Sequence, residues 1–229
     1  MIPGLTYVYA CPDCQYRVSK RSILSGNTFG ATHYSDLRID APMYPSYPRI
    51  TKCEQCQCIF WLDKETEMEG SIRPDFFNLF LDDEDIPPKE TKNPAFGDQL
   101  ELHPAEELDR ESIKDALFMN VQRNLEDEQY LRQLLLWSYH KQLENGSISR
   151  EELNTDRDYL ENIDAFYNII ESDNESRPFQ AELMRFAGKF DRSLEILEPY
   201  IEEFMGPVIG EIHDRCLAGN RDVFQLDMG

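Results

Sequence analysis

Cys11-Pro12-Asp13-Cys14 and Cys53-Glu54-Gln55-Cys56 are the two stretches that decide how the first part of this chain folds. Each is a Cys-x-x-Cys pair, and 38 residues lie between Cys14 and Cys53. Such a pair lets two thiolates reach one ion, and the intervening segment brings the two pairs together. The spacing therefore predicts a tetrahedral site for a structural Zn²⁺ ion, with four protein ligands: Cys11, Cys14, Cys53 and Cys56.

Strand-forming residues surround both pairs. Residues 5–10 (LTYVYA) are β-prone and lead into the first pair, and residues 59–62 (IFWL) lead out of the second. Pro12 stiffens the first turn, and the backbone amides after such a turn point back at the sulfurs. The pattern of strand, metal turn and strand, repeated twice, predicts a small N-terminal β domain.

These pairs and their flanking strands resemble the paired knuckles of the zinc-ribbon and rubredoxin-like group over about residues 5–63. The resemblance implies a zinc ribbon. A typical knuckle has glycine after its second cysteine, whereas Gln15 and Gln57 stand there in this chain. Rubredoxin holds iron with the same ligand set, so iron is the alternative to zinc.

Two other residues are alternative ligands. Cys58 is close enough in sequence to replace Cys53 or Cys56, but the x-x spacing favours those two, and Cys58 then fits a small apolar strand residue. His33 would complete a Cys3His site. With four better-spaced cysteines present, a surface position is favoured for His33.

Charged residues are unevenly distributed along the chain of 229 residues. Its formal net charge is −21, but residues 1–65 carry seven Lys/Arg and six Asp/Glu, so the acidity lies in the remainder. Such a break predicts a domain boundary. We expect a zinc-ribbon-like domain at 1–65, an acidic, Pro-containing linker at 66–103 and a helical domain at 104–229. Strong acidity disfavours general binding to nucleic acid or to anionic membranes.

Apolar residues recur at helical spacing in the last part of the chain. We expect helices from Pro104 to about 121, and at about 126–143, 150–170, 178–187, 190–204 and 208–217, with residues 223–226 packing back. Pro104 suits the first turn of a helix. The predicted fold class is therefore α+β, with a small β zinc ribbon followed by an all-α, repeat-like domain.

Residues 182–197 (ELMRFAGKFDRSLEIL) resemble the centre of a tetratricopeptide repeat over about residues 178–200. Gly188 falls at the turn between the helices, Phe190 at the aromatic position and Ser193 at the small position, where alanine is usual. One repeat cannot bury its own face. The resemblance therefore implies a small array of stacked helices.

A basic face is the feature that favours an alternative function. Arg17, Lys20 and Arg21, with Tyr16 and Phe29 nearby, are typical of a ribbon that contacts nucleic acid. They are equally typical of a strand edge guarded by charge, which we favour.

No catalytic motif accompanies the cysteines. His-Glu-x-x-His, a Gly-rich phosphate loop and Gly-x-Ser-x-Gly are all missing from the sequence. His213 and Cys216 would share a helix face, which suits a metal or an activated thiol, but a buried cysteine beside a solvent-side histidine is the commoner arrangement. We expect a non-enzymatic protein that binds an unidentified protein partner; a site between ribbon and helices is the enzymatic alternative.

The sequence also indicates a cellular location. No stretch approaches the 18–20 apolar residues of a membrane span, and residues 1–5 lack the features of a signal peptide. Six cysteines, four in metal-type pairs, fit a reducing compartment. The expected location is the cytoplasm.

Overall fold

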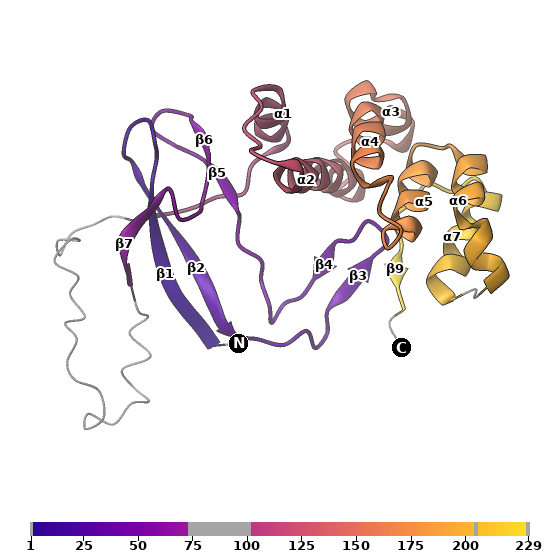
Figure 1. Ribbon diagram of the computed structural model, residues 1–229, viewed down its shortest axis with the longest axis horizontal. Helices are drawn as coiled ribbons and strands as arrows, with labels where there is room; N and C mark the ends of the chain where they lie inside the picture. Colours follow the sequence, from indigo (N-terminus) through magenta and orange to yellow (C-terminus); the bar gives the residue numbers. More distant parts are fainter. Residues whose placement is uncertain (1, 73–101, 204–205, 228–229) are drawn as a thin grey trace. The chain divides into compact units, whose positions relative to one another are not determined.

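The computed structural model describes residues 2–72, 102–203 and 206–227 (Figure 1). Within these ranges the chain contains strands and seven helices, so the mixed α+β class is confirmed. None of the helices described is long and apolar enough to cross a membrane. The predicted linker at 66–103 lies largely outside the described residues.

Contacts divide the chain into two compact units. One contains residues 1–30 and 41–108, and we call it the cysteine unit. The other contains residues 31–40 and 109–229, and we call it the helical unit. Residues 31–40, the inserted segment, thus lie in sequence between the two cysteine pairs but belong to the helical unit.

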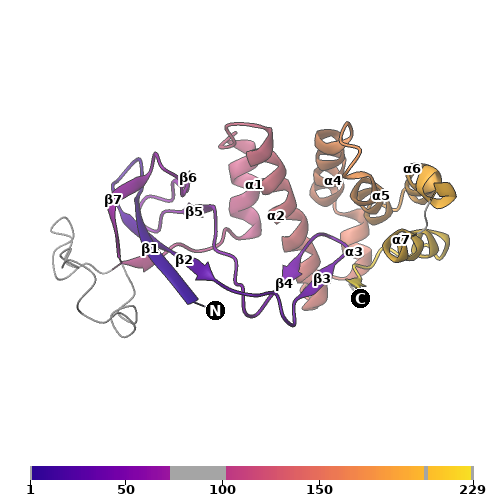
Figure 2. The ribbon, with the colours of Figure 1, turned by 60° about the horizontal axis from the view of Figure 1, so that its bottom comes forward.

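The cysteine unit is built on a four-stranded sheet of order β7-β1-β2-β8. Strands β1 (Ile2–Ala10) and β2 (Arg17–Ser25) are antiparallel and run side by side (Figures 1 and 2), with β7 (Glu67–Ile72) on the other edge of β1. A separate hairpin pairs β5 (Ile50–Lys52) with β6 (Ile59–Trp61). Each cysteine pair thus occupies the turn between two antiparallel strands.

The core of the cysteine unit gathers around the cysteines. One cluster of buried residues includes both cysteine turns and their flanking segments: Tyr9, Cys11, Val18, Cys53, Phe60 and Leu62. Alternation along a strand explains why Val18 is buried on β2. Two of the four cysteines, Cys11 and Cys53, are therefore part of the packed interior of this unit.

The predicted start of the first helix at Pro104 is wrong. Pro104 lies in β8 (His103–Pro104), which pairs in parallel with β2 opposite Ser19. An edge strand tolerates proline because one side of it needs no amide donor. The first helix, α1 (Arg110–Phe118), begins later because the Asp109 carboxylate caps it, accepting from the Ser112 amide at 2.7 Å.

The helical unit stacks each helix on its neighbours. After α1 come α2 (Leu125–Glu144), α3 (Arg150–Thr155), α4 (Arg157–Ile170), α5 (Arg177–Phe186), α6 (Phe190–Glu203) and α7 (Pro207–Leu217). Helix α2 packs on α1 and α4, α5 on α4 and α6, and α7 on α6. The core is aliphatic and aromatic, with Leu131, Leu136, Tyr139, Ile163, Phe166, Leu183, Phe186 and Leu197 almost fully buried.

The helix predicted at 150–170 is broken at Asp156. The ψ of Asp156 is 117°, which ends α3, and its carboxylate then caps α4 by accepting from the Tyr159 amide at 2.9 Å. Ser149 and Glu152 form a capping box at the start of α3. The break follows because an aspartate that caps a new helix cannot itself stay helical.

A three-stranded sheet of order β4-β3-β9 ties the inserted segment into the helical unit. Strand β3 (Thr32–Tyr34) pairs with β4 (Ile39–Asp40) on one side and with β9 (Gln225–Leu226) on the other. The prediction that residues 223–226 pack back is confirmed. What they pack on is the segment between the cysteine pairs.

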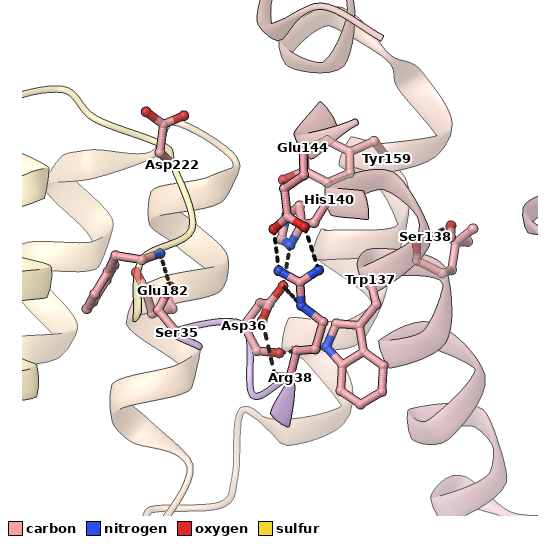
Figure 3. Close-up of polar contacts among 12 residues, drawn as sticks. Ser35, Asp36, Arg38, Trp137, Ser138, His140, Glu144, Tyr159, Glu182 and Asp222 are labelled. Carbon is pink, nitrogen blue, oxygen red and sulfur yellow. Dashed lines mark hydrogen bonds and ion pairs between the residues drawn. The ribbon is translucent and has the colours of Figure 1, made fainter. Parts of the chain in front are cut away.

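Asp36, at the turn of the inserted segment, is fully buried among helix side chains (Figure 3). Its carboxylate accepts from His140 Nδ1 at 2.8 Å, and its backbone carbonyl accepts from Trp137 Nε1 at 2.8 Å. Because a carboxylate only accepts, His140 Nδ1 carries the proton of this hydrogen bond, and His140 Nε2 lies 3.1 Å from the Tyr159 hydroxyl. Arg38 reaches from the same turn to Glu144. We call these residues the Asp36 cluster.

Candidate metal centre

The structure brings together the four predicted cysteines. Their sulfurs all lie within 4.8 Å of one another. Cys11 Sγ is 3.5 Å from Cys56 Sγ, and Cys14 Sγ is 3.5 Å from Cys53 Sγ. Zn–S bonds of 2.3 Å in a tetrahedron place the sulfurs about 3.8 Å apart, so the cluster has the size that one ion requires.

The two metal turns share one backbone geometry. The amide of Gln15 donates to Cys11 O and that of Gln57 to Cys53 O, both at 2.9 Å. Both glutamines occupy the left-handed region, with φ of 62° and 66°. This is the position at which a typical knuckle has glycine.

The side chains of these glutamines compensate for the missing glycine. Gln15 Nε2 donates to Cys11 O at 3.2 Å and Gln57 Nε2 to Cys53 O at 3.3 Å. A left-handed non-glycine residue costs about 1–2 kcal/mol, and a hydrogen bond returns about 1 kcal/mol of it. Both turns therefore form without glycine, and in each turn a glutamine takes the left-handed position.

The sulfur environments differ in how well they tolerate negative charge. Burial raises the pKa of the Cys11 thiol to about 11. The Tyr16 amide lowers the pKa of Cys14, but burial and the neighbouring sulfurs outweigh it and raise that pKa to about 12. At Cys53 burial is overcome by the amides of Cys56 and Gln55, which lower its pKa. A metal cation bound among the four sulfurs would favour the thiolate form of each.

The two alternative ligands lie outside the cluster of four. Cys58 packs partly buried against the core of the cysteine unit, and burial raises the pKa of its thiol to about 11. His33 lies in β3 of the helical unit, opposite Leu226. Neither belongs to the group of side chains that can share one ion.

The predicted basic face is divided by the pleat of β2. Arg17 and Arg21 fall on one face of the strand and Lys20 on the other. Burial and the nearby Arg49 lower the pKa of Lys20. The Tyr16 side chain already has partners within the protein, since its ring lies against His103 and its hydroxyl donates to Glu54 at 3.1 Å. The three basic residues therefore do not form one surface.

The His213 and Cys216 pair shows no shared site. Cys216 is buried and donates to Ser193 Oγ at 3.2 Å, and burial raises its pKa. His213 is half-buried beside Asp214 at 3.2 Å. A buried thiol with a raised pKa is a poor nucleophile.

Comparison of the chain with models of protein families, with curated proteins and with solved structures gives no match.

Proposed function

We propose that the four cysteines hold a structural Zn²⁺ ion in a zinc-ribbon-like unit. The observation that carries this proposal is the set of four sulfurs within 4.8 Å of one another. With Cys11, Cys14, Cys53 and Cys56 all bound, a tetrahedral ion keeps no open position for water or substrate. Such an ion stabilises the fold, and the unit would be non-catalytic.

Elemental analysis of protein purified without chelator tests the metal. We expect one zinc per chain and a colourless protein, whereas iron on the same four thiolates would absorb visible light. Cys11→Ser should abolish stoichiometric binding, since three thiolates hold the ion less tightly. Purified protein without zinc or iron would end the proposal.

We further propose that the helical unit binds a partner protein in the cytoplasm. Its tetratricopeptide-like pair, α5 and α6, supports this, because Gly188 adopts φ of 76° at the turn and Ser193 is fully buried at the helix contact. The Ser193 hydroxyl donates to Ala181 O at 2.8 Å, so serine fills the small position with its own hydrogen bond. Arrays of stacked helices of this kind suit protein binding.

Affinity purification of the full chain from native lysate tests this role. A partner should be recovered reproducibly at physiological salt and recovered in smaller amount with Arg185→Met, which destabilises the helical unit and leaves the cysteines intact. If repeated purification recovers nothing beyond the resin background, the interaction role is wrong.

A further inference from the structure

An open hollow of about 480 Å³ lies along one face of α6. It is lined by five α6 residues and one α7 residue: Asp191, Leu194, Glu195, Glu198, Ile201 and His213. The α6 residues follow one another at spacings of three, one, three and three, which places them on a single helix face. We call this surface the α6 groove.

Another face of α6 packs into the core. Ser193, Ile196 and Leu197 are buried by packing on α5 and α7. By contrast, Leu194 and Ile201 are only half-buried, while Asp191, Glu195 and Glu198 are exposed. The α6 groove thus offers two apolar contacts on its floor and three carboxylates on its rim.

We propose that the α6 groove binds a basic peptide segment of a partner protein, one that presents two or more Lys or Arg and an apolar side chain. This inference rests on the proposed protein-binding function and assigns its site. Three of the six lining residues carry carboxylates. Cationic side chains complement them, whereas phosphate or an acidic surface is repelled. A second copy of this chain, with net charge −21, is repelled for the same reason.

The dimensions set the length of the segment. Asp191 to Ile201 spans about 15 Å along the helix axis at 1.5 Å per residue. An extended peptide covers that distance with about five residues. Alternate side chains of such a peptide are about 6.6 Å apart, close to the 6 Å that separates Asp191 from Glu195 along α6.

The ion pair already present at the rim does not block the site. Arg192 binds Glu195 at 2.9 Å, but half or more of each side chain is exposed. Exposed pairs contribute little and exchange partners readily. An incoming guanidinium or ammonium can therefore share Glu195, while Leu194 and Ile201 take its apolar neighbour.

Fluorescence anisotropy with the full chain tests the proposal. The probe is a fluorescein-labelled pentapeptide that alternates lysine with leucine, and its counterpart alternates glutamate with leucine. We expect salt-dependent binding of the basic probe only, weakened about tenfold or more by Glu195→Lys/Glu198→Lys. Leu194→Ser should also weaken binding while leaving the salt dependence unchanged.

The matched control, called the α4 control, is Glu161→Lys/Glu171→Lys, with Glu161 on α4 and Glu171 at its C-cap. It changes the net charge by the same amount, and Glu161, like Glu195, pairs with an arginine on its own helix at 2.6 Å. This control should bind the basic probe as the unaltered chain does. Equal weakening by both double variants would show attraction to overall charge and overturn the proposal.

A partner purified from lysate separates this site from the function on which it rests. If Glu195→Lys/Glu198→Lys loses a partner that the α4 control retains, the α6 groove is the site. If both variants retain the partner, protein binding stands and the α6 groove is the wrong surface.

Discussion

The cysteine unit has four thiols at its centre, whereas the helical unit has polar side chains that satisfy one another. In the helical unit Arg185 pairs with Glu182, and Asp36 pairs with His140, all of them buried. In the cysteine unit the four sulfurs lie within 4.8 Å of one another, an arrangement that could hold one metal ion. The proposed Zn²⁺ ion would be supplied from outside the chain, whereas the cation buried beside Glu182 is the side chain of Arg185.

The largest effect should come from Cys53→Ser. Metal binding in structural thiolate sites is worth about 10–16 kcal/mol, and that energy is folding energy. We expect loss of bound zinc and rapid amide exchange in β1, β2, β5 and β6, while the helical circular dichroism persists. Cys58→Ser is the control and should keep one zinc. Loss of zinc from both variants would mean that Cys58 is also a ligand.

Arg185→Met should give the next largest effect, now in the helical unit. Arg185 Nη2 donates to Glu182 Oε1 at 2.9 Å and to Asp222 O at 3.0 Å, so its loss leaves a buried carboxylate unpaired. Breaking a buried pair costs about 3–5 kcal/mol. Urea unfolding followed by circular dichroism should show this, with zinc content unchanged. Arg157→Met, which breaks an exposed pair, should not move the midpoint.

Gly188→Ala should destabilise the helical unit by less than Arg185→Met does. At φ of 76° alanine costs about 1–2 kcal/mol, and its Cβ would overlap the Arg221 guanidinium. Gly146→Ala is the matched control, since φ is 74° there and nothing lies within 4 Å of an added Cβ. The difference between the two variants measures the displacement of Arg221. Equal losses would mean that Arg221 moves without cost.

The smallest effect concerns the metal turn itself. Gln57→Gly removes the left-handed strain and one hydrogen bond together, so zinc affinity should change by less than about tenfold. Gln57→Val keeps the strain, adds a β-branch and loses the hydrogen bond, so it should weaken zinc binding more than Gln57→Gly. Competition with a chromogenic chelator measures both. If Gln57→Gly binds zinc more weakly than Gln57→Val, the role given to the side-chain amide of Gln57 is wrong.

The parts of the fold that local spacing determines could be predicted from the sequence. The Cys-x-x-Cys pairs specify a turn and its ligands within four residues, and α2, α5 and α6 follow from their apolar periodicity. The prediction of a helix start at Pro104 is wrong because proline suits the first turn of a helix and an edge strand equally well. Asp156 was missed because a capping aspartate and an exposed helical aspartate look alike in one sequence.

The inserted segment could not be predicted, because its place depends on distant residues. Asp36 is buried only through His140 and Trp137, which lie about a hundred positions later. Nothing near Asp36 in sequence distinguishes it from a loop aspartate. Gln15 and Gln57 are visible in the sequence as departures from glycine. Their compensating hydrogen bonds depend on the three-dimensional turn and could not be predicted.

The pairing of β3 with β9 has a consequence for biosynthesis. His33 is made early but meets its strand partner Leu226 only after nearly all of the described chain has been translated. Until then the buried face of the inserted segment, with Asp36 at its turn, has no final partner on that side. Contacts of such long sequence separation form late and slowly. Synthesis of β9, more than the synthesis of any helix, should therefore time the completion of the helical unit.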